Sequence, residues 1–479
     1  MPKILPQIKH VVVVMFENRS LDNVCGWLYR APVALPKYFL QAGGSAHYDG
    51  LDSSLWNPRN ASYFKGDPPD KIPIMDSATS LTNPNVDPEE TFDHVTRQLY
   101  GPAGDTNPVE LSMLGFVVDY EYATAGNPVE IMEPFSADQV GVLSALARSY
   151  AISDAWFCSV PSQTWPNRAF VHSGTSNGNV NNGDHPNPFA WNVQTIFNVL
   201  QEMGLSWTVY SDASVAPSLT RTMFPKLWDP LLSDHFRDMD DFEASCRGGS
   251  LGAYSFVEPN FLSNPNDYHP PHDVRAGEQF LLRIWNAVSQ SPGWNETLLI
   301  ITFDEHGGTY DHVLPPTGAA TPDKASDPGE SGFRFDRFGV RVPTILVSPW
   351  IEAGTVFRSN TDTPLDHTSV LATVRDWLDI PADKMLLSKR IAHAPTLDYV
   401  LTRTTPRADK PQIDAPAAPS LTSATLPIND LQKSLVTGTA ARFGMDSRAT
   451  LSGIKTRQHA VDFFAQRALA PTAQKRALP

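Results

Sequence analysis

Two pairs of polar residues with metal-binding chemistry stand directly after short apolar runs. Glu17-Asn18 follows HVVVVMF (10–16), and Asp304-Glu305 follows LLIITF (298–303). Carboxylate and amide oxygens are ligands that hard divalent cations prefer, and adjacent carboxylates repel each other unless a cation or protons offset their charge. The pairs therefore predict one metal site, with a helix N-cap at Glu17-Asn18 and a solvated loop at Asp304-Glu305 as the alternatives.

A hydroxyl suited to attack on phosphorus lies in PSQTWPNR (161–168), where Thr164 precedes a predicted helix. The start of a helix offers N–H donors and the positive end of its dipole to a phosphate. A hydroxyl beside a metal loses its proton more readily and becomes a nucleophile. The alternative is that Thr164 only caps the helix.

Histidines gather late in the chain, at 269 and 272 in NDYHPPHD (266–273) and then at 306, 312 and 367. A single histidine is often structural. Five within about a hundred residues, among Asp-rich loops, indicate that several converge on a phosphate or a metal.

The elements that must position these groups alternate between strands and helices. The predicted strands are 10–16, 150–152, 206–210, 254–257, 298–303 and 342–347, and apolar helical spacing predicts helices over 140–147 and 277–288. This order predicts an α/β three-layer sandwich with a mainly parallel central sheet. Ligands bind at the carboxyl ends of such strands, so we expect Glu17, Asp304 and the Ser348-Pro349-Trp350 segment at one edge.

The rest of the chain divides by composition. Residues 34–110 and 177–275 have little periodicity and predict long loops over the sheet edge that shape a pocket. We expect a main domain over 1–405 and a linker rich in Pro, Ala, Ser and Thr over 406–427. Helical spacing of Ile428, Leu431 and Leu435, and of Val461, Phe464 and Ala468, predicts a C-terminal extension over 428–479, either a cap or an oligomer contact.

Charge and composition argue against several classes of partner and of protein. Lys and Arg total 37 against 52 Asp and Glu, a net charge of −15, which argues against nucleic acid and anionic membranes as partners. A zwitterionic lipid surface is less affected. Apolar runs stay below the ~18 residues that span a bilayer. Three separated cysteines predict no disulfide framework, and MPKILPQIKH shows no apolar signal region, which leaves the route of export open.

Six segments together resemble the bacterial phospholipase C and acid phosphatase phosphoesterase family, which plant non-specific phospholipases C also join. They are FENRSLDNVCG (16–26), SVPSQTWPNRAFVHSGTSNG (159–178), NDYHPPHDVRAGEQ (266–279), ITFDEHGGTYDHVLPP (301–316), FGVRVPTILVSPW (338–350) and DHTSVL (366–371). The resemblance implies an alkaline-phosphatase-like fold and a secreted or periplasmic location.

The resemblance also implies roles for individual residues. Glu17, Asn18, Asp304 and Glu305 would hold the metal, with Thr164 completing the coordination as nucleophile. Asn167, His269 and His367 would face the phosphate, with His272 and His312 also in the site. One segment departs from the family pattern: in DPEETFDH (87–94), Glu90 stands where a histidine is expected. Either His94 takes over that role or the leaving-group acid differs.

These inferences combine into a hypothesis of function. One or more divalent ions (Zn, Ca, Mg or Mn) activate Thr164, which attacks a phospholipid, phosphatidylcholine being favoured, and His269 protonates the leaving oxygen. Candidates for holding a choline ammonium are Trp165, Tyr120, Tyr268, Asp184 and Glu90. The alternatives are an acid phosphatase and a non-catalytic lipid- or metal-binding module, which would lack the nucleophile or a ligand. A sulfatase is disfavoured because no Cys-x-Pro-x-Arg occurs.

Overall fold

The centre of the molecule is a nine-stranded sheet. The computed structural model describes residues 4–41, 46–104, 112–183, 190–212 and 216–468. The strands lie in the order β2 (Tyr38–Leu40), β12 (Thr355–Phe357), β5 (Ala151–Ser153), β11 (Thr344–Val347), β10 (Thr297–Phe303), β1 (His10–Phe16), β9 (Tyr254–Glu258), β7 (Trp207–Ser211) and β8 (Phe236–Asp238). Two small ribbons pair β3 (Trp56–Pro58) with β4 (Lys71–Pro73) and β6 (Trp156–Phe157) with β13 (Leu365–Asp366).

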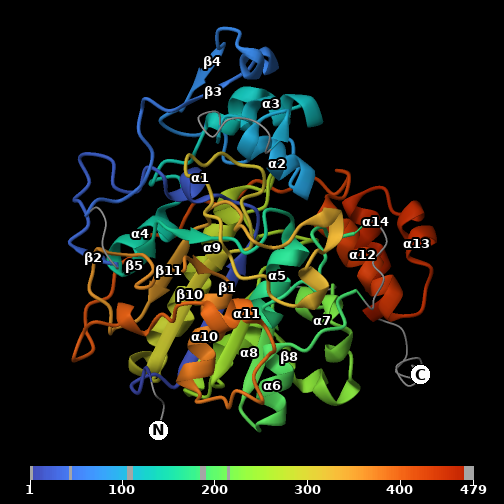
Figure 1. Ribbon diagram of the computed structural model, residues 1–479. Helices are drawn as coiled ribbons and strands as arrows, with labels where there is room; N and C mark the ends of the chain where they lie inside the picture. The colour runs from blue at the N-terminus through green and yellow to red at the C-terminus, as the bar shows by residue number, and fades with distance from the viewer. Residues whose placement is uncertain (1–3, 42–45, 105–111, 184–189, 213–215, 469–479) are drawn as a thin grey trace.

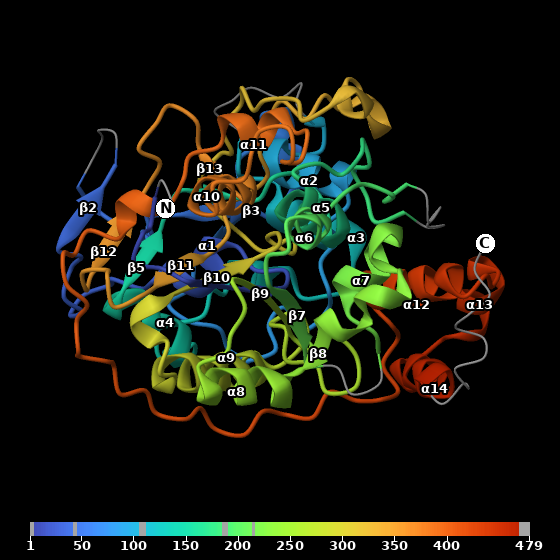
Figure 2. The ribbon, with the colours of Figure 1, turned by 90° about the horizontal axis from the view of Figure 1, so that it is seen from below.

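Helices cover both faces of the sheet (Figure 2). One face carries α4 (Gly141–Ser149), α8 (Met239–Gly248) and α9 (Val274–Gln290), and the other carries α5 (Thr164–Ser173), α6 (Ile196–Glu202), α10 (Thr368–Trp377) and α11 (Lys389–His393). The apolar face of α9, including Phe280, Leu281 and Ile284, is buried as its spacing predicts. The helix begins earlier than predicted because the Asp273 side chain caps it through Arg275 N. The predicted three-layer α/β sandwich is confirmed.

The register of the central strands decides where the polar pairs lie. The valines of β1 are at most 1% exposed, as expected for a strand buried on both faces. Phe16 of β1 is paired with Phe303 of the parallel strand β10. The chain therefore leaves the sheet at Glu17 and Asp304 side by side, and Asp304 N donates to Phe16 O at 3.1 Å.

The expectation for the 342–347 strand is wrong in direction. β11 runs antiparallel to both β10 and β5, whereas the other pairs within this sheet are parallel. Ser348 consequently lies at the opposite edge from Asp304, and its hydroxyl donates to the carbonyl of Thr297, the first residue of β10. Arg341, three residues before β11, lies instead at the edge where Glu17 and Asp304 emerge.

The segments predicted as long loops hold more structure than expected. Residues 34–110 contain β2, the β3–β4 ribbon and α2 (Phe92–Tyr100); α1 (Leu21–Cys25) precedes them and α3 (Phe116–Ala123) follows (Figure 1). Residues 177–275 contain α6, α7 (Leu219–Met223), α8 and three strands of the sheet. These short elements escape periodicity analysis because each spans only one to three turns. Short 3-10 helices lie at Ala61–Lys65, Pro128–Met132, Pro225–Leu227, Pro230–His235, Trp294–Glu296, Lys324–Ser326, Glu330–Gly332 and Asp398–Val400.

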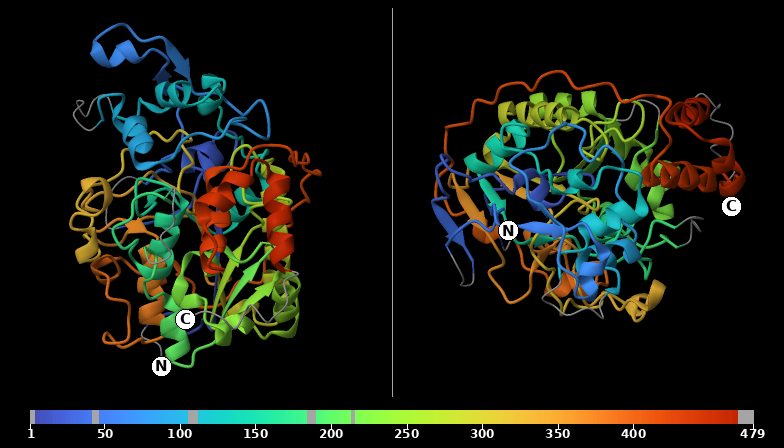
Figure 3. Two further views of the ribbon diagram at one scale, coloured as in Figure 1. Left: turned by 90° about the vertical axis from the view of Figure 1, so that its right-hand side faces the viewer. Right: turned by 90° about the horizontal axis from the view of Figure 1, so that it is seen from above.

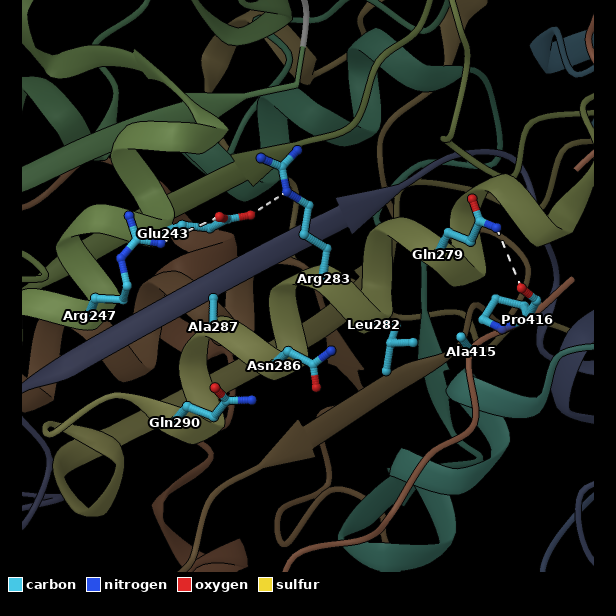
Figure 4. A pocket seen from close by; sticks show the side chains of 10 residues that line it. All are labelled: Glu243, Arg247, Gln279, Leu282, Arg283, Asn286, Ala287, Gln290, Ala415 and Pro416. Carbon is cyan, nitrogen blue, oxygen red and sulfur yellow. Dashed lines mark hydrogen bonds and ion pairs between the residues drawn. The ribbon is translucent and has the colours of Figure 1, made fainter. Parts of the chain in front are cut away.

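The segment 406–427 is docked along the body of the molecule. It runs past α9 to the C-terminal helices (Figures 2 and 3), where Ser420 N donates to Asp273 Oδ2 at 2.8 Å and Gln279 Nε2 to Ala417 O at 3.3 Å. Ala415 and Pro416 close a cavity of about 500 Å³ against α8 and α9 (Figure 4). The extension that follows forms α12 (Asp430–Arg442), α13 (Ser447–Gly453) and α14 (Arg457–Ala468).

Two further sequence predictions concern cysteines and membrane spans. All three cysteines are buried and unpaired, in agreement with the absence of a disulfide framework. Across the described ranges, every helix is too short or too polar to cross a bilayer.

Candidate active site

Four predicted metal ligands meet at the ends of β1 and β10. Glu17, Asn18, Asp304 and Glu305 are each 0% exposed. Asp304 Oδ1 accepts from the backbone N–H of Asn18 at 3.0 Å and of Glu305 at 2.8 Å, which ties the two strand ends together. Asn18 holds a left-handed φ of 55°, a strained conformation for a residue other than glycine. A Cβ at Gly307 would lie 2.3 Å from Asn18 O, so the glycine permits this close approach.

The donor set fits a hard divalent cation. Asn18 Oδ1, Asp304 Oδ2 and Glu305 Oε1 are buried oxygens without a hydrogen-bond partner among the described residues. Leaving such atoms unsatisfied is costly unless a ligand binds them. Burial raises the pKa of both Glu17 and Glu305 well above the usual range; the charge of Asp304 adds to this at both, and Arg168 only partly opposes it at Glu17. A cation among these oxygens would compensate both the missing contacts and the repulsion.

The predicted nucleophile adjoins this set. Thr164 is the first residue of α5, is 1% exposed, and its hydroxyl donates to Glu17 Oε2 at 3.0 Å. One helical turn later, Arg168 donates from Nε to Glu17 Oε1 at 2.8 Å and lies 4.0 Å from Asp304 Oδ2. Its Nη1 has no partner in the described part of the chain. Sequence reasoning missed Arg168, although its i+4 spacing from Thr164 puts both on one helix face.

Two residues predicted to face the phosphate hold the site together instead. Asn167 accepts from Val160 N at 2.9 Å and donates to the carbonyls of Val160, Ser162 and Gln163, which fixes the loop before Thr164. His367 donates from Nε2 to Asp304 O at 2.7 Å, and its Nδ1 accepts from Trp156 Nε1 at 3.4 Å. Both ring nitrogens are thereby engaged, so this geometry suits positioning.

The other three histidines near the metal ligands differ in the partners of their ring nitrogens. His269 Nδ1 donates to Pro270 O at 2.6 Å, which leaves Nε2 as the proton acceptor; burial lowers its pKa to about 4. His272 donates from Nδ1 to Asp267 Oδ1 at 2.7 Å, and Asp267 was missed from sequence although it lies in the same motif. His306 lies behind Glu305, where burial lowers its pKa to about 3.

Segment 87–94, which differs from the family pattern, reaches the site through the carboxylate of Glu90. Glu90 Oε1 accepts from Asn18 Nδ2 at 3.3 Å, so Glu90 touches a predicted metal ligand. His94 lies further along on α2, with its Nδ1 at 3.0 Å from Asp119 Oδ1. The structure therefore brings Glu90, rather than His94, to the ligand set.

The predicted aromatic cage does not assemble around a cation. Trp165 packs edge-on against Trp191, Tyr268 donates to Glu278 Oε1 at 2.5 Å, and Tyr120 donates to Val86 O at 2.9 Å. All three are at most 2% exposed. Asp184 lies outside the described residues.

His312 belongs to a second polar cluster. Asp22, Asp311 and His312 have the residue types of a metal site and place candidate ligand atoms within 4.8 Å of one another. The guanidinium of Arg341, however, donates to Asp311 Oδ1 and Asp22 Oδ1, each at 3.0 Å. His312 Nδ1 lies 2.6 Å from Asp22 Oδ2. This cluster already contains its cation, which argues against a metal there.

A pocket of about 380 Å³ opens beside the ligand set. Glu90 and His272 line it, so it is continuous with the groups around Asn18 and Asp267. Its other wall comes from 426–433, at the start of the C-terminal extension. A pocket of this size accommodates the polar part of an ester substrate.

Comparisons with known proteins agree with this chemistry. The model of the phosphoesterase family matches residues 8–381. Non-specific phospholipase C1 of Arabidopsis thaliana is 36% identical over 421 residues, 86% of this chain and 74% of that protein. Phospholipase C B of Mycobacterium tuberculosis is 26% identical over 455 residues, 87% of this chain and 82% of that protein.

Solved structures give a much weaker likeness. The phosphonate monoester hydrolase of Agrobacterium radiobacter is 14% identical with a TM-score of 0.32, over 65% of this chain and 79% of that one. A protein in the alkaline phosphatase superfamily from Vibrio parahaemolyticus is 11% identical with a TM-score of 0.32, over 54% of this chain and 66% of that one.

Proposed function

Because this chain belongs to the phosphoesterase family and is a phosphoric ester hydrolase, we propose that it is a metal-dependent phospholipase C with Thr164 as nucleophile. The observation that carries the proposal is the 3.0 Å hydrogen bond from the Thr164 hydroxyl to Glu17, beside buried oxygens that lack partners among the residues the structure describes. The names of the plant and mycobacterial relatives support the phospholipase C activity.

Metal binding, nucleophilic attack and charge stabilisation are assigned to different residues. Glu17, Asn18, Asp304 and Glu305 would hold a divalent cation, whose positive charge would lower the pKa of the nearby hydroxyl and offset charge on the phosphoryl oxygens. As Thr164 Oγ1 forms a bond to phosphorus, its proton passes to Glu17 Oε2, the bond to the diacylglycerol oxygen breaks, and a phospho-threonine diester results. Arg168 Nη1 and the N-terminus of α5 stabilise the negative charge that develops on the phosphoryl oxygens.

Proton transfer falls to His269. Its Nδ1–H is held by Pro270 O, so Nε2 is the atom that exchanges protons with the substrate. The low pKa makes its charged form a strong acid, which protonates the leaving oxygen. In the second step Nε2 takes a proton from water as the water attacks phosphorus. The bond between phosphorus and Thr164 Oγ1 breaks, Oγ1 takes its proton back from Glu17, and the phosphorylated headgroup leaves. His367 and Asn167 are positioning residues in this scheme.

The favoured substrate is phosphatidylcholine. Since Trp165, Tyr120 and Tyr268 are turned into the core, recognition of a quaternary ammonium would depend on carboxylates such as Glu90 rather than on an aromatic cage. The phosphomonoesterase alternative requires the same nucleophile and metal but no site for a headgroup cation.

The test compares p-nitrophenyl phosphorylcholine with p-nitrophenyl phosphate, before and after chelation, for the wild type, Thr164→Ala and Thr164→Ser. We expect chelator-sensitive cleavage of the diester, activity lost in Thr164→Ala, and partial activity in Thr164→Ser because a hydroxyl remains. A near-normal rate for Thr164→Ala contradicts the mechanism. Preference for the monoester would indicate an acid phosphatase, and activity on neither substrate would indicate a binding module.

A further inference from the structure

The first turn of α12 lies against the active site, although it belongs to the C-terminal extension. Asn429 caps the helix by accepting from Gln432 N at 2.8 Å, and its Nδ2 lies 3.4 Å from His269 Nε2. Asp430 Oδ2 accepts at 3.4 Å from Gln163 Nε2, the side chain next to Thr164 in the chain. This turn therefore contacts the proposed acid His269 directly, and it contacts Gln163, the residue before the proposed nucleophile Thr164.

Close packing further along the helix fixes its position. A Cβ at Gly438 would lie 2.9 Å from Trp165 Cη2, so α12 approaches the residue that follows Thr164 as closely as its backbone allows. The helix also packs against α7, beside which it lies in Figure 2. The contacts reach from Asn429 to Gly438, about two and a half turns of helix.

The pocket beside the ligand set is lined by charges of both signs. Its carboxylates are Asp87, Glu89 and Glu90 from one wall and Asp430 from α12, and its permanent cations are Lys433 and Arg457. The carboxylates outnumber the cations and repel one another, so the pocket favours a ligand that brings a positive charge.

Two side chains indicate that the pocket is built for a ligand. Arg457 is 5% exposed, lines the pocket, and its Nη1 has no hydrogen-bond partner among the described residues, so it can donate to an oxygen of a bound molecule. Lys433 Nζ lies 2.6 Å from Asp430 Oδ1, and the same ammonium interacts favourably with the charges of Glu89 and Asp87. The ammonium of Lys433 therefore lies among the carboxylates of the pocket.

We propose that Asp430, with Asp87, Glu89 and Glu90, binds the positively charged headgroup of the substrate, and that Lys433 occupies this position until the headgroup displaces it. This inference rests on the proposed function, which places the phosphate at the neighbouring ligand set. The C-terminal extension is then part of the substrate site, and Asp430 is a specificity-determining residue. Arg457 donates to an oxygen of the same ligand.

The experiment measures KM and kcat of metal-loaded full-length protein for two diesters, p-nitrophenyl phosphorylcholine and the uncharged-headgroup analogue p-nitrophenyl ethyl phosphate. Asp430→Asn should raise KM for the choline diester about tenfold, as expected for a lost ion pair, and change the ethyl diester less than about twofold. Lys433→Met removes the ammonium that competes with the choline headgroup. It should therefore lower KM for the choline diester and leave KM for the ethyl diester unchanged. The matched control is Asp240→Asn, which removes a carboxylate from a side chain that is 92% exposed on α8.

Equal losses on both diesters, no loss on either, or a raised KM in Lys433→Met would overturn the inference. Asp430→Glu should restore discrimination, which separates recognition from misfolding. Calorimetric binding of phosphocholine and inorganic phosphate provides a readout independent of turnover: Asp430→Asn should weaken only phosphocholine. If the wild type cleaves neither diester, the proposed function fails, whereas the phosphocholine measurement still decides the inference.

Discussion

Two carboxylate clusters lie a few residues apart at the same edge of the sheet, and they differ in what balances their charge. In one, oxygens of Asn18, Asp304 and Glu305 have no hydrogen-bond partner in the described part of the chain, and the guanidinium of Arg168 donates to Glu17. In the other, the guanidinium of Arg341 donates to both Asp22 and Asp311. Both contain acidic residues that follow β1 and β10.

The difference teaches that residue type alone does not identify a metal site. Asp22, Asp311 and His312 have the composition of one, yet His312 and Arg341 supply the protons and the charge that a metal would otherwise provide. The Glu17–Asp304 cluster shows the opposite: buried oxygens of Asn18, Asp304 and Glu305 have no hydrogen-bond partner among the described residues. Unpartnered oxygens, rather than carboxylates as such, indicate where a cation is needed.

The largest expected effect follows from removing one ligand. Glu305→Gln should reduce kcat about 1000-fold, because an essential positive charge is bound less tightly at the reacting phosphate. The metal-free variant should unfold at the same or a higher urea concentration than the wild type, since one repelling carboxylate is gone. A variant that is inactive and also much less stable without metal would place Glu305 in a structural role like that of Asp311.

At the second cluster, the loss of its cation is expected to show as a loss of stability. Arg341→Met should lower the free energy of unfolding by about 3–5 kcal/mol, because it leaves buried Asp22 and Asp311 without their cation. Urea unfolding measures this loss. The control is Lys9→Met, whose ion pair with Glu296 is exposed and should cost less than about 1 kcal/mol. Equal effects would mean that the buried network contributes no more than a surface pair.

A smaller effect concerns pH. Burial opposes the charge on His312, but its hydrogen bonds to Asp22 and Asp49 prevail and raise its pKa to about 10. A pKa raised in the folded state contributes stability that is fully present below about pH 6.5, the unfolded value. That contribution is lost as pH rises through 10. The difference in unfolding midpoint between the wild type and His312→Gln should therefore shrink between pH 6.5 and 10; a constant difference contradicts the assigned pKa.

Local features of the sequence were enough to predict the sheet and its chemical edge. The β-branched run 10–16 and the apolar run 298–303 form β1 and β10, and the polar pairs that follow them meet because parallel strands end at one edge. The direction of β11 could not be predicted, since an apolar run is the same for parallel and antiparallel pairing. Its reversal brings Arg341, not Ser348, to this edge.

Roles that depend on long-range contacts also escaped prediction. Asn167 and His367 have the residue types of phosphate ligands, but their partners, Val160 and Asp304 O, are set by loop geometry and by tertiary packing. Arg168 could be placed on the face of Thr164, yet nothing local shows that Glu17 is its partner. The contact of Asn429 with His269 joins residues 160 positions apart and was invisible to local analysis.

The central claim is that a divalent cation binds among Glu17, Asn18, Asp304 and Glu305. The most direct measurement is an anomalous difference map from a crystal of the full chain grown with Mn²⁺. The account predicts a strong peak among these four side chains, within coordination distance of Thr164, and none between Asp22, Asp311 and His312. A peak at the second cluster, or no peak at the first, would contradict it.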